Sequence, residues 1–203
     1  DHLIMLLTKY YLKKRSGPII FDVKCSSQLP ALINELGGEA IMEKTGHFNI
    51  KKAIKKHNAV LGGEMSGHIF INHEWYGFDD AIYTAAILAQ IISDDALSSS
   101  EVINKFPKTF STPELNLDVS DDEKFKMVEQ FKSEMSFPNS ELNTIDGVRV
   151  TIGSAWGLVR ASNTSPKLVL RFEAETEEEL KEIKELFLDN LKRIFPDLSL
   201  NFS

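Results

Sequence analysis

Cysteine, long apolar runs and an excess of basic residues are all missing from this sequence, and each absence excludes a class of protein. Cys25 is the only cysteine among 203 residues, so we expect no internal disulfide framework and a reducing compartment, most simply the cytoplasm. No apolar run approaches the roughly 20 residues that cross a bilayer. The formal net charge of -7 argues against a general nucleic-acid binder, whose affinity comes mainly from Lys and Arg on phosphates. We therefore expect neither nucleic acid nor a membrane as a partner.

Sequence motifs for the common cofactors are missing as well. The chain has no P-loop, no Gly-rich dinucleotide fingerprint, no Cys/His cluster for zinc and no Asp-x-Asp loop for magnesium. Asp79 and Asp80 are adjacent, so their side chains do not converge on a helix, and we interpret both as helix-start residues. His57 and His73 are interpreted as surface or packing residues. The sequence thus predicts no metal site.

The first half alternates short apolar runs with helical patterns. A helix is expected from Leu3 to about Lys14, and the later candidates are the strands IIFDV, EAIMEK and NAVLGGE and the helices QLPALINEL and IKKAIKKH. The segment DDAIYTAAILAQIIS is apolar almost all round, which predicts a buried helix. The pattern is typical of an α/β domain, a mixed sheet with covering helices.

A shift to Ser, Thr and Pro between residues 95 and 115 marks a domain boundary, and we place the domains at 1–105 and 106–203. Capping boxes are expected where Ser or Thr precedes Glu by three positions, and these pairs are Ser98 with Glu101, Ser120 with Glu123, and Thr176 with Glu179. The strands GVRVTIG, AWGLVRAS and KLVLRFEAE alternate in polarity between the two longer helices. The second domain is predicted to be α+β, with an antiparallel sheet and two helices.

The segment LGGEMSGHIF, residues 61–70, places an acid, a hydroxyl and an imidazole at alternate positions among glycines. Alternate side chains of an extended segment point to the same side, so Glu64, Ser66 and His68 are expected to form one row. Such a row suits the hydroxyls of a sugar. A carboxylate accepts hydrogen bonds from these hydroxyls, whereas a serine hydroxyl and an imidazole can each donate or accept. A Gly-rich turn with an exposed acid is the competing interpretation.

Two further polar segments follow strand candidates. KTGH comes directly after EAIME, and Lys24 lies near the end of FDVKC. Ligands of open α/β sheets bind at the loops after the carboxyl ends of strands, so Lys24, Thr45 and His47 are expected to line the same cleft as Glu64. An ordinary turn for KTGH and a solvated Lys24 are the alternatives.

The segment RASNTSP lies between two strand candidates of the second domain. Arg160 offers a rigid fork of donors to a phosphate, and Ser162, Thr164, Ser165 and the turn amides can surround the remaining oxygens. We interpret the segment as a phosphate cradle, with a plain Ser/Asn/Pro hairpin turn as the alternative.

Taken together, FDVKC, KTGH, GGEMSGH followed by GFDDAIYTAA, and VRASNTSP resemble the third and fourth domains of the α-D-phosphohexomutase family, of the phosphomannomutase/phosphoglucomutase type. The order and spacing of these motifs match over nearly the whole chain. The resemblance implies an α/β domain with a sugar loop and a TBP-like α+β domain with a phosphate loop. It also implies an isomerase that interconverts hexose 1-phosphate and hexose 6-phosphate through a phosphoserine and a bisphosphorylated sugar.

The resemblance also implies roles for individual residues. Glu64 and Ser66 would read the sugar hydroxyls, with His68 beside them, and either His47 or His68 is a candidate acid/base. The other residues that it places at the sugar are Lys24, Thr45, Gly46 and His47, and those that it places at the phosphate are Arg160, Ser162, Asn163 and Thr164.

The phosphoserine and magnesium loops of the family have no counterpart here, so we expect this chain to bind a hexose phosphate without turning it over. Mg²⁺ and a hexose 1,6-bisphosphate activator would belong to the full-length enzyme, and the missing N-terminal domains of the same polypeptide would be its partners. A stand-alone sugar-phosphate binding or regulatory module is the main alternative, and a purely structural interaction module is a third. The choice between mannose and glucose stays open, because one glutamate and serine pair can serve both epimers.

Overall fold

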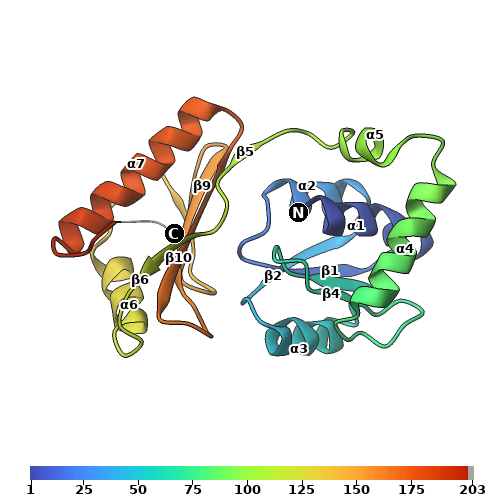
Figure 1. Ribbon diagram of the computed structural model, residues 1–203, viewed down its shortest axis with the longest axis horizontal. Helices are drawn as coiled ribbons and strands as arrows, with labels where there is room; N and C mark the ends of the chain where they lie inside the picture. The colour runs from blue at the N-terminus through green and yellow to red at the C-terminus, as the bar shows by residue number, and fades with distance from the viewer. Residues whose placement is uncertain (201–203) are drawn as a thin grey trace. The chain divides into compact units, whose positions relative to one another are not determined.

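The computed structural model describes residues 1–200 and divides the chain into two compact units, residues 1–107 and the residues from 108 onward (Figure 1). Each unit has its own sheet and its own apolar core. Within the described part of the chain, no helix combines the length and the apolar character that crossing a membrane requires. We call residues 1–107 unit 1 and the remainder unit 2.

Unit 1 is built on a mixed four-stranded sheet with the strand order β2-β1-β3-β4. β1 runs parallel to β2 and β3, while β4 is antiparallel to β3. The predicted α/β class is therefore confirmed for this unit. Its strands are β1 (Pro18–Asp22), β2 (Glu39–Glu43), β3 (Leu61–Gly63) and β4 (Ile69–Ile71).

Helices cover both faces of this sheet, as Figure 1 shows. Ile19 and Phe21 of β1 pack into the core with α1 (His2–Lys14) and α2 (Gln28–Glu35). Ile20, which points the other way, packs against α3 (His47–His57). This alternation along one strand explains why β1 is apolar at nearly every position, since strands covered on both faces have no solvent side.

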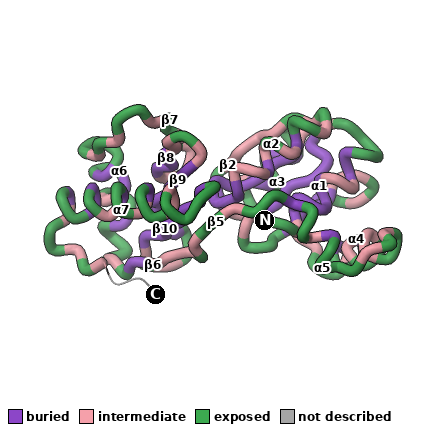
Figure 2. Tube along the Cα trace, turned by 90° about the horizontal axis from the view of Figure 1, so that it is seen from above, coloured by how far each residue is buried: buried purple, intermediate pink, exposed green. Residues whose placement is uncertain are grey.

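The helix expected to be buried, α4 (Ala81–Asp94), is mostly accessible, so that prediction was wrong. Thr84 and Ile87 are its buried residues, whereas Ile82 is 86% exposed. Figure 2 shows α4 in the colours of intermediate and exposed residues. Apolar residues around a helix do not determine how many sides are covered, and α4 contacts β4 while most of its residues remain accessible. The short α5 (Ser99–Ile103) follows it, with the predicted capping box of Ser98.

Unit 2 contains an antiparallel six-stranded sheet with the order β5-β10-β9-β8-β7, and β6 also pairs with β10. Two helices, α6 (Lys124–Glu134) and α7 (Glu177–Ile194), lie on the same face (Figure 1), which confirms the predicted α+β class. The strands are β5 (Phe110–Ser111), β6 (Leu115–Asp118), β7 (Glu141–Asn143), β8 (Val148–Ile152), β9 (Ala155–Ala161) and β10 (Lys167–Ala174).

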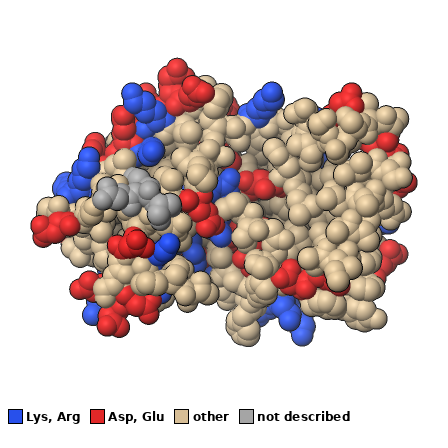
Figure 3. Space-filling model, viewed as in Figure 1, with Lys and Arg blue, Asp and Glu red and all other residues tan. Residues whose placement is uncertain are grey.

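The two helices of unit 2 begin differently. Thr176 and Glu179 form the predicted capping box at the start of α7. The box expected from Ser120 and Glu123 is absent, because Ser120 accepts the Glu123 and Lys124 amides through its carbonyl oxygen, and α6 begins only at Lys124. Over this unit Lys and Arg side chains lie among Asp and Glu side chains in the view of Figure 3, which agrees with the acidic composition of the chain.

Candidate functional site

The three parallel strands of unit 1 end at one edge of the sheet, and the polar segments singled out in the sequence follow those ends. Lys24 comes after β1, Thr45 after β2 and Glu64 directly after β3. Parallel strands necessarily bring their carboxyl ends together, which is why three segments distant in sequence share this edge. We call these residues, together with the turn that carries Ser66 and His68, the strand-end site.

Asp22, the last residue of β1, joins the loops of the strand-end site. It is fully buried and its carboxylate accepts hydrogen bonds from the Thr45 hydroxyl at 2.9 Å and from the Met65 amide at 3.0 Å. The Cys25 thiol donates to the same carboxylate at 3.2 Å. Asp22 was not predicted as a site residue, although its position at the end of an apolar strand is a signal for one.

Lys24 is buried, which is contrary to the alternative of a solvated lysine. Its side chain is 7% exposed and its Nζ lies 3.7 Å from Oδ2 of Asp22. A buried ammonium needs a nearby carboxylate, because the desolvation cost of an isolated charge exceeds what folding can offset. Asp22 therefore fixes a positive charge at the edge where the three strands end.

The segment from Glu64 to His68 is a tight turn between β3 and β4 and not an extended row, so the predicted alternation was wrong. The Glu64 amide donates to the His68 carbonyl at 2.9 Å, and the Gly67 amide donates to the Glu64 carbonyl at 3.0 Å. Gly67 has φ +99, which other residues rarely adopt. Gly63 and Ile69 pair across the antiparallel strands that the turn connects, and this pairing reverses the chain before the alternation can continue.

Glu64 is a buried acid with an unsatisfied oxygen, contrary to the alternative of an exposed one. The residue is 5% exposed, and its Oε1 has no hydrogen-bond partner among the described residues. Its Oε2 lies 3.5 Å from the Ser66 hydroxyl. Burial raises the pKa of the Glu64 carboxyl, and the Asp22 carboxylate raises it further. Such a carboxylate gains free energy from any ligand hydroxyl that donates to it.

His47, His68 and Asp79 gather beside this turn. Oδ2 of Asp79 lies 2.7 Å from Nδ1 of His68 and 3.5 Å from Nε2 of His47. The two imidazole rings meet edge to face with centroids 4.2 Å apart. We call these three residues the His–His–Asp cluster.

The interpretation of Asp79 as a helix-start residue was wrong, while that of Asp80 is confirmed. Asp80 caps α4 by accepting the Tyr83 amide at 2.9 Å. Asp79 instead points to the histidines, and its Oδ1 accepts the Ile69 amide at 3.2 Å. This position of Asp79 was not predicted, because the sequence does not show which of two adjacent acids caps the helix, and neighbours in an extended segment point to opposite sides.

The cluster does not suit magnesium. Within residues 1–200 it is the only group of three His, Cys, Asp or Glu side chains whose ligand atoms lie close enough to hold an ion. Magnesium prefers oxygen ligands in a near-octahedral arrangement, and two of these three ligands are imidazoles. No step of a reaction is therefore assigned to magnesium on this chain.

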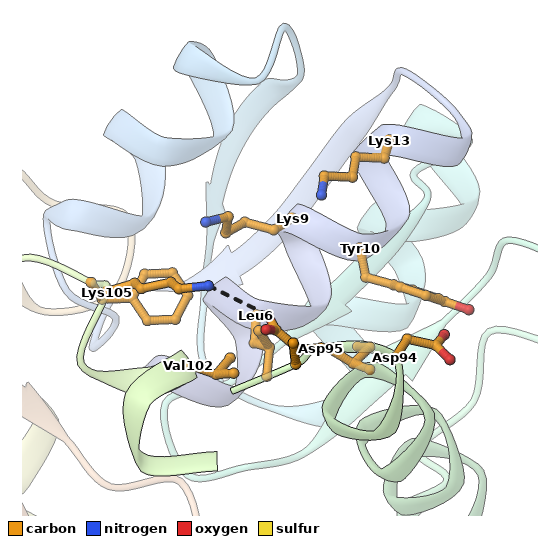
Figure 4. A pocket seen from close by; sticks show the side chains of 11 residues that line it. Leu6, Lys9, Tyr10, Lys13, Asp94, Asp95, Val102 and Lys105 are labelled. Atoms are coloured by element: carbon orange, nitrogen blue, oxygen red, sulfur yellow. Dashed lines mark hydrogen bonds and ion pairs between the residues drawn. The ribbon is translucent and has the colours of Figure 1, made fainter. Parts of the chain in front are cut away.

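Two hollows lie on the surface of unit 1. One of about 770 Å³ opens between α3 and the segment before α4, and His47, Asp79, Lys51 and Phe48 are among its lining residues. The other, of about 460 Å³, lies among α1, the end of α4 and α5 (Figure 4). The second contains none of the predicted site residues, and its Lys105 is already paired with Asp95 at 3.4 Å.

The Arg160 side chain in unit 2 is held by one acid and keeps a donor available. Its Nε donates to Asp146 at 2.9 Å, and the residue is 4% exposed. Its Nη2 has no hydrogen-bond partner among the described residues. An unsatisfied guanidinium nitrogen on an otherwise fixed side chain can donate to an anion without rearrangement.

The loop that follows Arg160 is a hairpin turn organised around Ser162. The Ser162 hydroxyl oxygen accepts the amides of Thr164 at 3.3 Å and Ser165 at 3.2 Å. These two amides are used inside the loop, so the expectation that turn amides surround a phosphate was wrong for them in this structure. Lys124 of α6 donates to the Ser165 carbonyl at 3.0 Å and holds the loop from the helix side.

The fold defines a two-unit protein, with an α/β unit followed by an α+β unit. Residues 1–110 match the model of the phosphoglucomutase/phosphomannomutase alpha/beta/alpha domain III, and residues 114–190 match that of the phosphoglucomutase/phosphomannomutase C-terminal domain. The chain therefore belongs to the phosphoglucomutase/phosphomannomutase family.

Individual relatives agree with this family. The chain is 50% identical over 203 residues to a phosphomannomutase/phosphoglucomutase of Pseudomonas syringae and 49% identical to one of Pseudomonas aeruginosa; each match takes in 100% of this chain and 44% of the relative. A solved structure of a family protein from Burkholderia thailandensis is 40% identical with a TM-score of 0.91, and the match covers 98% of this chain and 43% of that one. The chain thus spans less than half the length of the relatives that it matches.

Proposed function

We propose that the strand-end site of unit 1 recognises the hydroxyls of a hexose phosphate. The observation that carries this proposal is the buried Oε1 of Glu64, which has no partner among the described residues. A sugar hydroxyl that donated to this oxygen would satisfy it, and Ser66 is close enough to bind a neighbouring hydroxyl. The other residues assigned to this site are Lys24, Thr45, Gly46, His47 and His68.

The phosphate of the same ligand is assigned to the Arg160 loop of unit 2. Nη2 of Arg160 supplies a charged donor, and the hydroxyls of Ser162 and Thr164 and the amide of Asn163 complete the candidate set. Asp146 supports this assignment because it engages Nε and so fixes the direction of the fork.

In the complete protein, these sites would serve a phosphomannomutase/phosphoglucomutase that interconverts hexose 1-phosphate and hexose 6-phosphate. The phosphoserine, Mg²⁺ and the further domains would come from the rest of the polypeptide, with a hexose 1,6-bisphosphate as activator and the cytoplasm as location. In-line phosphoryl transfer requires a nucleophile and a cation that neutralises charge, so binding is the share assigned to this chain.

Calorimetric titration of the chain with glucose 1-phosphate and mannose 1-phosphate tests the proposal. We expect saturable binding that Glu64→Gln weakens by at least about tenfold, since a charge-assisted hydrogen bond contributes about 1.5 to 3 kcal/mol. Glu39→Gln is the matched control, because Glu39 is exposed at the amino end of β2, the far end of the same sheet. Equal affinity of the wild type and Glu64→Gln for both ligands would remove Glu64 from the site.

The phosphate half is tested by Arg160→Lys, which keeps the charge and loses the fork. We expect weaker binding of the phosphosugar, with binding of the unphosphorylated hexose unchanged. Arg193→Lys in α7 is the control for loss of a guanidinium on the same unit.

A coupled assay with magnesium and glucose 1,6-bisphosphate should detect no conversion of glucose 1-phosphate by the pure chain. Turnover above background would contradict the proposal that this chain binds the phosphosugar without converting it.

A further inference from the structure

We propose that the His–His–Asp cluster of unit 1 is a binding site for a first-row transition-metal ion, best suited to zinc, with one coordination position left open. The three ligand atoms lie within 4.8 Å of one another and come from three separate segments: the start of α3, the turn before β4 and the segment before α4. The cluster shares His47 and His68 with the proposed sugar site, but sugar binding does not require this ion, so titration with zinc alone tests the metal site separately from the proposed function.

Two of the three ligand-to-ligand distances can be compared with those of a tetrahedral zinc centre. Ligand atoms bound at about 2.0 to 2.2 Å around a tetrahedral ion lie about 3.3 to 3.6 Å apart. The distance between Nε2 of His47 and Oδ2 of Asp79 is 3.5 Å, and that between Nδ1 of His68 and the same oxygen is 2.7 Å. Both side chains of the histidines are about half exposed, at 50% and 46%, so small rotations suffice to equalise these distances.

Neighbouring groups already hold two of the ligands in place. The Ile69 amide donates to Oδ1 of Asp79 at 3.2 Å, which leaves Oδ2 directed to the histidines. The buried ring of Phe70 meets the His47 ring edge to face, with centroids 5.5 Å apart. Hydrogen bonds such as that of the Ile69 amide orient metal ligands in known sites and raise their affinity.

The chemistry of the set selects the ion. Two imidazoles and one carboxylate suit zinc and its first-row neighbours better than magnesium or calcium, which prefer oxygen. Three protein ligands and an open fourth position are typical of zinc sites that bind water or a ligand. Coordination through Nδ1 of His68 requires the tautomer with its proton on Nε2, so the hydrogen bond from His68 to Asp79 would be exchanged for two metal bonds.

Lysine side chains near the cluster repel a cation and so limit its affinity for zinc. Lys51, Lys52 and Lys55 line the same hollow of about 770 Å³ as His47 and Asp79. Their repulsion is screened by salt, whereas coordinate bonds at the cluster are not. Zinc affinity is therefore expected to rise with ionic strength, opposite to the behaviour of a diffuse acidic patch.

Zinc alone is the probe. Isothermal titration of the chain with Zn²⁺ should give one equivalent of saturable binding, and Co²⁺ in its place should give the intense visible absorption of a tetrahedral site. His47→Ala and His68→Ala should each weaken zinc binding by at least about tenfold. His57→Ala is the matched control, since His57 lies at the other end of α3 and outside the cluster; it should bind zinc as the wild type does.

Two results would overturn the site. One is zinc binding by the double variant His47→Ala with His68→Ala that is as tight as that of the wild type. The other is a Co²⁺ spectrum of the wild type that remains that of the hydrated ion. Asp79→Asn retains an oxygen acceptor for the Ile69 amide, so it tests the third ligand without removing that hydrogen bond, and it should also weaken zinc. Circular dichroism of each variant separates loss of a ligand from loss of the fold.

Discussion

The two sites of this protein are assembled in different ways. The strand-end site of unit 1 collects residues from three loops, and one buried side chain, Asp22, contacts all of them. The Arg160 loop of unit 2 is a single hairpin between β9 and β10, and its internal hydrogen bonds come from within four residues. Removing the shared residue of the strand-end site should disturb all three loops at once. Removing one residue of the Arg160 loop should cost only the hydrogen bonds of that residue.

The largest effect is expected from Asp22→Ala in unit 1. Removing this carboxylate takes away the ion pair of Asp22 with the buried Lys24 ammonium and the hydrogen bonds that it accepts from Thr45 and Met65. Breaking a buried ion pair costs about 3 to 5 kcal/mol. Urea denaturation should show a lower free energy of unfolding. Hydrogen exchange should show that the backbone amides of unit 1 lose protection, while those of unit 2 keep it.

The control for that loss is Asp118→Ala in unit 2. Asp118 is 81% exposed and lies 3.9 Å from Lys167, so its removal should cost about 0 to 1 kcal/mol. Similar losses for Asp22→Ala and Asp118→Ala would contradict the role of Asp22 as a shared centre.

The second-largest loss of stability is expected from Gly147→Ala in unit 2. This change disturbs the backbone at Val159 and Arg160, directly before the Arg160 loop. Gly147 has φ +75, and a Cβ there would overlap the Val159 carbonyl and lie 2.6 Å from Cβ of Arg160. Positive φ and a backbone clash together should cost about 2 to 3 kcal/mol of unfolding free energy. Gly153→Ala has φ +60 but meets open space, so it should cost only about 1 kcal/mol. Equal losses in urea denaturation would show that the close approach to Arg160 is unimportant.

A smaller effect is expected from Ser162→Ala, which removes one atom of the hairpin. Its hydroxyl accepts two amides of the loop, so we expect a loss of about 1 kcal/mol and little change elsewhere. Ser133→Ala is the control, because the Ser133 hydroxyl bonds only a neighbouring carbonyl on the exposed side of α6. A Ser162→Ala loss as large as that of Asp22→Ala would remove the distinction between the two sites.

The smallest effect, and one of opposite sign, is expected from Glu64→Gln. Its raised pKa means that the folded chain binds more protons than the unfolded chain through the carboxyl range, so wild-type stability falls as pH rises there. Glutamine does not titrate, so the variant should be more stable than the wild type at neutral pH, and the difference should disappear in acid. Thermal melts across that range measure it.

The opposite sign is expected from Glu101→Gln. Hydrogen bonds from Ser98 lower the pKa of the Glu101 carboxyl, so its contribution to stability is present above the carboxyl range and is lost as pH falls. Glu101→Gln should therefore be less stable than the wild type at neutral pH. A change in stability of the same sign for both variants would contradict the assignment of Glu64 as a buried carboxylate whose pKa is raised.

Local sequence determined those parts of the protein whose contacts lie within a few residues. The capping box of Thr176 and Glu179 and the alternating strands of unit 2 were predicted, and the hairpin after Arg160 was named as an alternative, because caps, pleats and turns depend on neighbouring residues. The mixed sheet with covering helices in unit 1 was also predicted, from the alternation of apolar runs and helical patterns.

Only the tertiary structure decided which side chains meet. Asp79 reaches two histidines 11 and 32 positions away, and Asp22 reaches Met65 43 positions away, separations at which no local pattern indicates contact. α4 is exposed because the sheet ends at β4, which the apolar residues of the helix do not encode. Packing of distant elements sets burial and partners, whereas the sequence of one segment sets only its own conformation.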